Sequence, residues 1–126
     1  MARIIRTEKA PAPVGPYSQA VEVDGTLFCS GQIPIVPETG VLLTGDVQEQ
    51  ARQVMVNVEA VLSAADYKWT DVVKTSIFLT DLGNFAAVNE IYAQYFPSNP
   101  PARSCVQVAA LPKGVDVEVE VLARKS

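Results

Sequence analysis

The chain has 126 residues, of which 48% are hydrophobic and 19% charged, and its formal net charge is −4. This composition predicts one globular domain over residues 1–126 and offers no clustered basic face, which argues against a nucleic-acid partner. No segment approaches the roughly 20 apolar residues that span a bilayer, so we expect no membrane partner. No long apolar run follows the charges of the N-terminus, so we expect no secretory signal, and the two cysteines are widely spaced. These features favour a reduced, cytoplasmic protein, or a mitochondrial one if the source is eukaryotic.

Histidine is absent from the whole sequence. Its absence excludes Ser-His-Asp and Cys-His catalysis and removes the commonest metal ligand. Any chemistry must therefore depend on carboxylates, arginine, lysine, cysteine, tyrosine, backbone groups and water.

The first third of the chain is predicted to contain short strands and a long loop. A proline-rich segment follows the first strand and suits neither a helix nor a central strand. Asp24-Gly25 separates two apolar runs, a pattern that is typical of a β-hairpin. The expected elements are, in order, a strand over 2–6, a proline-rich connection over 10–16, strands over 20–23 and 26–30, and a loop over 31–45 with a small strand at 41–43.

The rest of the chain alternates helices and strands. Asp46 can cap a long helix in which Val54, Val58 and Val61 recur at helical spacing. The expected elements are helices over 46–66 and 84–96 and strands over 72–80, 103–111 and 116–124. Elements in this order predict an α+β sandwich with the helices on one face of a sheet.

Alternation along the last three strands separates an apolar face from a mixed one. The apolar side, which we expect to carry the helices, contains Val73, Ile77, Leu79, Ser104, Val106, Val108, Val117, Val119 and Val121. The mixed side contains Lys74, Ser76, Phe78, Arg103, Cys105, Gln107, Glu118, Glu120 and Leu122. A solvated face fits this pattern, and so does a face that meets other subunits and forms a polar cleft with them.

Six short motifs run in order along almost the whole chain. They are Gly15-Pro16-Tyr17-Ser18-Gln19-Ala20, Ser30-Gly31-Gln32-Ile33, Val88-Asn89-Glu90-Ile91-Tyr92, Pro101-Ala102-Arg103-Ser104-Cys105-Val106, Leu111-Pro112-Lys113-Gly114 and Val117-Glu118-Val119-Glu120. Each motif is weak alone, but their order and spacing together are specific. The sequence resembles the RidA/YjgF family of enamine/imine deaminases, also known by the older label of L-PSP endoribonuclease or translation inhibitor.

The resemblance implies a chorismate-mutase-like α+β fold, in which a mixed β-sheet carries two helices on one face. It also implies a homotrimer whose sheets face inward, with sites in the clefts between subunits. The implied activity is that of a 2-iminobutanoate/2-iminopropanoate deaminase. Such an enzyme hydrolyses reactive enamine or imine acids, such as 2-aminoacrylate, to 2-keto acids and ammonia, and needs neither a metal nor a cofactor.

The resemblance assigns catalytic roles to two residues. Arg103 corresponds to the arginine that binds the substrate carboxylate, and a guanidinium suits that task because it can form two parallel hydrogen bonds. The alternative for an isolated arginine is a surface salt bridge. Glu118 corresponds to the glutamate that orients or deprotonates the attacking water. Glu118 could instead be an exposed strand residue without a catalytic role. Glu120, two positions further on, could also be the residue that acts on the water.

Further positions match residues that line the family's pocket. Cys105 is expected to contribute its backbone or its thiol, but not to act as a nucleophile, because no partner base is visible and imine hydrolysis needs none. A small buried residue is the alternative for Cys105, and a loop anchor is the alternative for Tyr17. The expected substrate-binding residues are Tyr17, Ser30, Gly31, Phe85, Asn89, Arg103 and Cys105.

Two other functions compete with imine hydrolysis. The family's older label is cleavage of single-stranded RNA, but the sequence has no histidine, no basic stripe and few aromatic residues for base stacking. A binding protein could use the same Arg103 cleft to sense a carboxylate metabolite or a partner enzyme without turnover. The sequence favours imine hydrolysis and does not indicate which imine is preferred.

Overall fold

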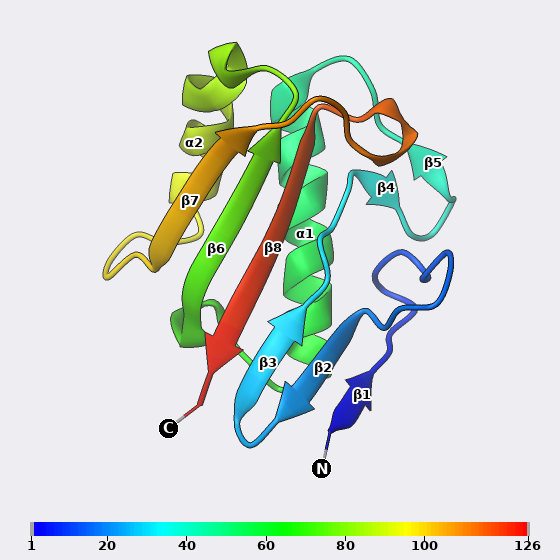
Figure 1. The fold of residues 1–126 in the computed structure, drawn as a ribbon, viewed down its shortest axis with the longest axis vertical. Coiled ribbons are helices and arrows are strands. Elements are labelled where there is room, and N and C mark those ends of the chain that lie inside the picture. The colour runs from blue at the N-terminus through cyan, green and yellow to red at the C-terminus, as the bar shows by residue number, and fades with distance from the viewer. Residues whose placement is uncertain (1, 126) are drawn as a thin grey trace.

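The computed structural model describes residues 2–125. Its main elements are β1 (Arg3–Ile5), β2 (Ala20–Val23), β3 (Thr26–Cys29), α1 (Val47–Ala64), β6 (Val72–Leu79), α2 (Phe85–Ala93), β7 (Ala102–Gln107) and β8 (Val117–Arg124). A separate small sheet consists of β4 (Ile35–Val36) and β5 (Val41–Leu42). The main sheet has the order β1-β2-β3-β8-β6-β7, and both helices lie behind it in the view of Figure 1. β6 and β7 are parallel whereas the other neighbours are antiparallel, so the sheet is mixed and the predicted α+β class is confirmed.

The first hairpin forms where Asp24-Gly25 predicts it. β2 and β3 pair directly on either side of this turn, with Val23 opposite Thr26. Asp24 has φ 49° and Gly25 has φ 79°. Positive φ at both central residues characterises the two-residue turn whose twist matches that of the flanking strands.

Helix α1 lies along the sheet and supplies much of the core. The side chain of Asp46 accepts a hydrogen bond from the backbone N of Gln48 at 2.8 Å, which caps the helix as expected. Val54, Val58 and Val61 are fully buried. A stripe with this spacing faces the sheet because residues three and four apart share one side of a helix.

Strand β7 is shorter than the predicted 103–111 because its neighbour in the sheet ends first. β6 ends at Leu79, which pairs with Gln107, the last residue of β7. One more bond, from Val108 N to Leu79 O at 2.8 Å, follows this pair. The second helix is also shorter than predicted and ends at Ala93, after which Gln94 N bonds back to Ile91 O in a tighter turn.

The predicted face of β8 is confirmed, whereas the predicted face of β7 is wrong. In β8, alternate residues from Val117 to Ala123 are buried. In β7, Arg103 pairs with Thr75 and Cys105 pairs with Ile77. Directly paired residues point to the same side, and because Thr75 and Ile77 are buried beneath the helices, Arg103 and Cys105 also point to the helix side. An edge strand covered only by the short helix α2 has no fully buried face, so its apolar residues do not mark the core side.

A β-bulge corrects a second face prediction, at the start of β6. The register shifts between Val72 and Lys74. Val72 is therefore buried, and Val73, which was expected to face the helices, is 46% exposed. A one-residue shift exchanges the two faces of a strand because side chains alternate with a period of two.

Every buried side-chain nitrogen and oxygen in residues 2–125 has a hydrogen-bond partner. Four amide side chains are among the buried polar groups: those of Gln19, Gln32, Gln50 and Asn57. Within the same residues, no helix has the length and apolar character that a membrane crossing requires.

Candidate functional site

The expected site residues form two groups on opposite faces of the main sheet. Arg103 lies on the helix side because it pairs with buried Thr75. Glu118 of β8 pairs with Phe78, and Phe78 lies three positions after Thr75 on β6. Side chains an odd number of positions apart point to opposite faces of a strand, so Glu118 projects from the open face. The sheet therefore separates the two predicted catalytic residues within one protomer.

The first group surrounds Arg103 at the β7 edge. Its Nη1 donates a hydrogen bond to Asn89 Oδ1 at 2.6 Å, and its guanidinium carbon lies 5.3 Å from the centre of the Phe85 ring and 5.0 Å from that of Tyr92. Aromatic faces attract a cation and hold its plane. A guanidinium has five N–H donors, so the bond to Asn89 leaves enough of them to bind both oxygens of a carboxylate.

Tyr92 is a member of this group that sequence reasoning did not assign. It is the last residue of the motif over 88–92, and its side chain is buried. Its hydroxyl lies 2.7 Å from Thr75 Oγ1, which fixes the ring against the sheet. A cavity of about 470 Å³ beside Arg103 is lined by Asn89, Tyr92, Ala93, Phe96, Pro100, Pro101 and Arg103.

Cys105 lies on the same face of β7 as Arg103 and packs against the core. Burial raises the pKa of its thiol, and the charge of Arg103 opposes that shift in part. A raised pKa keeps the sulfur protonated at neutral pH, and a thiol is a much weaker nucleophile than a thiolate. The buried Cys29 is even less reactive, since desolvation raises its pKa to about 12.

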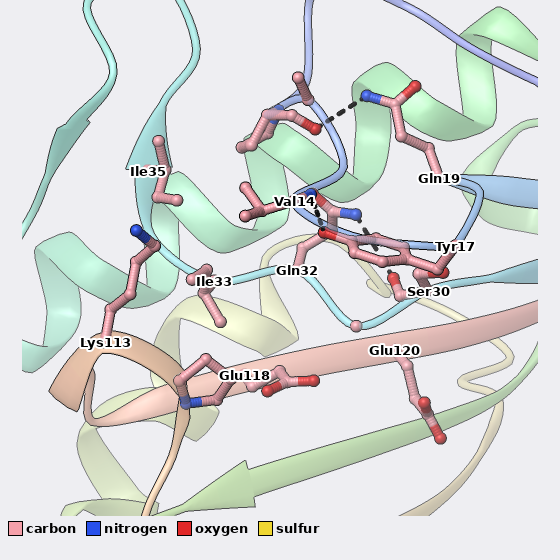
Figure 2. A pocket seen from close by; sticks show the side chains of 14 residues that line it. Val14, Tyr17, Gln19, Ser30, Gln32, Ile33, Ile35, Lys113, Glu118 and Glu120 are labelled. Carbon is pink, nitrogen blue, oxygen red and sulfur yellow. Dashed lines mark hydrogen bonds between the residues drawn. The ribbon is translucent and has the colours of Figure 1, made fainter.

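The second group lines a cavity of about 560 Å³ on the opposite side of the sheet, shown in Figure 2. Tyr17, Ser30, Gly31 and Glu118, all predicted site residues, contribute to it. Lys113 and Ile33 add one cationic and one apolar side chain from neighbouring loops. The remaining lining residues are Pro11, Ala12, Val14, Gln19, Gln32, Ile35, Pro112 and Glu120.

Gly31 and Glu118 are in close contact. The backbones of Gln32 and Val119 pair in both directions, at 2.8 and 3.2 Å, and this bridge draws the loop onto β8. A Cβ atom added at Gly31 would lie 1.9 Å from Glu118 Oε2. Any other residue at position 31 would therefore have to displace the carboxylate.

The environment of Glu118 favours its protonated form. Its pKa is raised first by burial and second by the negative charge of Glu120 on the same face. A carboxylate with a raised pKa is a stronger base than an exposed one and suits proton transfer near neutral pH. These properties make Glu118 a candidate acid–base group.

Tyr17 and Ser30 both line the cavity and anchor their own loops. Ser30 Oγ donates to Ser18 O at 2.6 Å, and Tyr17 OH accepts from Val14 N at 3.3 Å. The Tyr17 side chain is nevertheless 51% exposed. The pocket and loop-anchor interpretations of Tyr17 are thus compatible.

Gln19 supports this side of the cavity, although sequence reasoning gave it no role. Its Oε1 accepts from Thr7 N at 2.7 Å, and its Nε2 lies within hydrogen-bonding distance of the carbonyls of Thr7, Ala10 and Pro11, at 3.0, 3.3 and 2.9 Å. One buried amide therefore holds the proline-rich segment. The available signal was a glutamine directly before an apolar strand, inside a motif already singled out.

The fold is that of the RidA structures. RidA from the Antarctic bacterium Psychrobacter sp. superposes with a TM-score of 0.93 at 47% sequence identity, covering 98% of this chain and 99% of that one. The structure of E. coli TdcF with bound serine gives a TM-score of 0.94 at 46% identity, with coverage of 98% and 99%.

Comparison of sequences leads from this structural class to a family. The family model for Endoribonuclease L-PSP matches residues 7–125. Human 2-iminobutanoate/2-iminopropanoate deaminase is 53% identical over 121 residues, which are 96% of this chain and 88% of that protein. A RutC family protein of Pyrococcus horikoshii is 49% identical over 125 residues, or 99% of each chain. The chain belongs to the Endoribonuclease L-PSP family, which is the RidA/YjgF family that the sequence motifs predicted.

Proposed function

We propose that this protein hydrolyses small, reactive enamine or imine acids to 2-keto acids and ammonia, at a site that two copies of the chain build together. The observation that carries the proposal is the separation of Arg103 from Glu118 by the sheet. A carboxylate anchor and a base must both reach one small substrate. Since one protomer presents them on opposite faces, the β7 edge of one copy is proposed to face the Glu118 cavity of another.

Arg103 is the proposed anchor for the substrate carboxylate. Asn89 and the rings of Phe85 and Tyr92 hold its guanidinium plane, which reduces the conformational entropy lost on binding. The serine bound in the structure of TdcF is a small molecule with such a carboxylate. The names of several relatives at about half sequence identity supply the proposed substrate class.

Glu118 is the proposed base for the attacking water. The enamine first tautomerises to the imine, and water then adds to the protonated C=N carbon while Glu118 accepts its proton. The resulting carbinolamine takes this proton back on nitrogen. Ammonia then leaves as the carbonyl forms, and Glu118 accepts the proton of the carbinolamine hydroxyl. These steps need no covalent intermediate, no metal and no cofactor, and one positioned acid–base group contributes about 10²–10⁴-fold.

The open face of the sheet is the proposed contact between copies. Phe28 on β3 is 51% exposed and Val106 on β7 is 46% exposed, so apolar side chains extend across this face. Large exposed apolar side chains gathered on one face favour an interface. The proposed assembly is a homotrimer with inward-facing sheets, as the resemblance implies.

A coupled assay tests the proposal. A serine dehydratase generates 2-aminoacrylate in situ, and the rate of pyruvate formation is measured with wild type, Arg103→Ala, Arg103→Lys and Glu118→Ala. We expect wild type to accelerate hydrolysis and each variant to lose about 10²-fold or more, with Lys failing because it lacks the planar pair of donors. Arg52→Ala, at an exposed position of α1, is the matched control. If folded wild-type oligomer does not exceed the spontaneous rate, the proposal is wrong for this substrate.

A protein that binds a carboxylate metabolite without turnover is the second candidate. It is favoured by the serine in the structure of TdcF, a relative at 46% identity. Calorimetric titration with serine separates the two functions. Binding that depends on Arg103, combined with no acceleration by wild type, would replace the enzymatic proposal with the binding one.

A further inference from the structure

Helix α1 carries two amide side chains on its buried face. Gln50 is 1% exposed and Asn57 is fully buried, among aliphatic neighbours such as Val54 and Val58. The two amides are seven positions apart, so about two helical turns place them on the same side of the helix. Burying an amide is unfavourable unless its hydrogen bonds are restored. Both amides form such bonds: those of Asn57 reach a loop that lines the Glu118 cavity, and those of Gln50 reach Asp116, the residue directly before β8.

Asn57 holds the loop that covers Glu118. Its Nδ2 donates to the carbonyls of Ile33 and Ile35, at 3.1 and 2.9 Å. Its Oδ1 accepts from Gln53 Nε2 at 2.9 Å, which orients the amide so that both of its N–H groups point at the loop. Ile33 lies two residues after Gly31, the residue in contact with the carboxylate. Asn57 therefore fixes how far this loop can move from the helix.

Gln50 holds the strand from which Glu118 projects. Its Nε2 donates to Asp116 Oδ2 at 2.8 Å, and its Oε1 accepts from Asp116 N at 3.0 Å. Thr80 Oγ1 donates to the other carboxylate oxygen of Asp116 at 3.3 Å. Asp116 lies two residues before Glu118, so this double contact sets the position of β8 relative to the helix.

The loop and the strand meet in the bridge between Gln32 and Val119, at 2.8 and 3.2 Å. We propose that Gln50 and Asn57 are positioning residues that set the approach of Gly31 to Glu118, and so keep the catalytic carboxylate in its partly dehydrated place. A leucine at either position would be apolar like its neighbours, but it could not form the hydrogen bonds that fix the backbone segment. The catalytic part of this inference rests on the proposed function, whereas the effect on Glu118 does not.

Substitution of Asn57 tests the inference. Asn57→Leu keeps the side-chain size and removes both donated bonds, so the loop moves away and water reaches Glu118. We expect kcat to fall about tenfold or more, with KM changed less than threefold because Arg103 is on the other half-site. Solvation of Glu118 lowers its pKa, so the acidic limb of the kcat/KM profile moves to lower pH. Val61→Ala, one turn further along α1, is the control: it is expected to lose stability but keep kcat and the acidic limb.

A second measurement separates this inference from the proposed function. The carboxyl carbon of Glu118 is titrated by NMR in wild type, Asn57→Leu and Val61→Ala, so a result is obtained even if wild type hydrolyses no imine. A lowered pKa of Glu118 in Asn57→Leu alone supports the positioning role. An unchanged titration, or a kcat within twofold of wild type, overturns it. If Asn57→Leu does not fold, Gln50→Glu serves the same test, because it places a carboxylate against Asp116 Oδ2 and keeps the size of the side chain.

Discussion

At the scale of single residues, the contact between Gly31 and Glu118 links a small residue to the proposed catalytic base. The glycine is needed for space, because a Cβ atom would come within 1.9 Å of Glu118 Oε2. The Glu118 side chain is flexible at its end and can rotate away at little cost in folding free energy. If Glu118 is the base, we expect a substitution at position 31 to affect activity much more strongly than stability.

Replacement of Gly31 by alanine is the first prediction. Gly31→Ala should displace the Glu118 carboxylate and lower kcat about tenfold or more, because a base moved by about 1 Å is poorly placed for proton transfer. Differential scanning calorimetry should show a melting temperature close to that of wild type. Gly83→Ala is the control, because the φ of Gly83, like that of Gly31, lies outside the left-handed region, and its added Cβ would approach a carboxylate away from the cavity, 3.0 Å from Asp81 Oδ1. Full activity in Gly31→Ala would contradict the proposed role of Glu118.

The second prediction concerns pH and stability. Because the folded protein raises the pKa of Glu118, the native state binds more protons than the unfolded state between the ordinary pKa of a glutamate and the raised one. The free energy of unfolding therefore falls as pH rises through this window and stays lower above it. Glu118→Gln removes this ionisation, so its melting temperature should match that of wild type at acidic pH and exceed it at neutral pH.

Melting temperatures measured from pH 4 to pH 8 check this second prediction. Glu90→Gln, at an exposed position of α2, is the matched control. A variant that is less stable than wild type at neutral pH would show that Glu118 makes favourable contacts in the native state. That result would contradict the explanation that burial of Glu118 destabilises its charged form.

At the scale of elements, the position of the proline-rich segment depends on one side chain, that of the residue directly before β2. Gln19 is 2% exposed and contacts three backbone positions of this segment, Thr7, Ala10 and Pro11. Beyond the end of β1, this segment contains no strand and joins no sheet, so the bonds to Gln19 replace a sheet ladder. They also place Val14 and Tyr17 at the cavity.

Removal of this amide is the third prediction. Gln19→Leu leaves backbone donors and acceptors without their partner and should lower the free energy of unfolding by about 1–3 kcal/mol. Limited proteolysis should cut the segment over residues 7–17 faster than in wild type, with cleavage sites read by mass spectrometry. Gln94→Leu, at an exposed position, is the control. An unchanged cleavage rate would mean that the segment is held by other contacts.

At the scale of the whole molecule, the position of Arg103 and Glu118 on opposite faces leads to a prediction about mixed oligomers. Arg103→Ala and Glu118→Ala are each expected to be inactive, but they damage different half-sites. If a site uses Arg103 of one copy and Glu118 of another, random mixing restores about a quarter of the sites, because each half-site is intact in half of the copies.

Co-expression of the two variants with different affinity tags, followed by purification on both tags, provides the mixed oligomer for this fourth prediction. Purification on both tags removes trimers of a single variant, and every trimer that holds both variants has one intact site in three. Its rate of imine hydrolysis should therefore approach about one third of that of wild type, and its mass, measured by light scattering, should be that of a trimer. Oligomers that contain only one variant are the controls. A mixed oligomer as inactive as either parent would show that the two residues do not share a site across an interface.

Much of the fold could be predicted because its signals are local. The Asp24-Gly25 turn, the Asp46 cap and the alternation along β8 each depend on residues that are neighbours in the chain, and each was confirmed. The ordered motifs likewise predicted the family. The sequence by itself thus determined the class of fold and the family, and it proposed the candidate site residues other than Tyr92.

The tertiary structure decided how those residues are arranged. The prediction placed Arg103 and Glu118 on one mixed face, whereas the parallel register of β7 on β6 turns Arg103 toward the helices. No local pattern indicated the bulge that exposes Val73. None indicated the hydrogen-bond partners of Gln50 and Asn57 either. Strand register and the face that a helix covers depend on residues far apart in the chain. For that physical reason, only the folded protein separates the two half-sites and shows which backbone segments the buried amides hold.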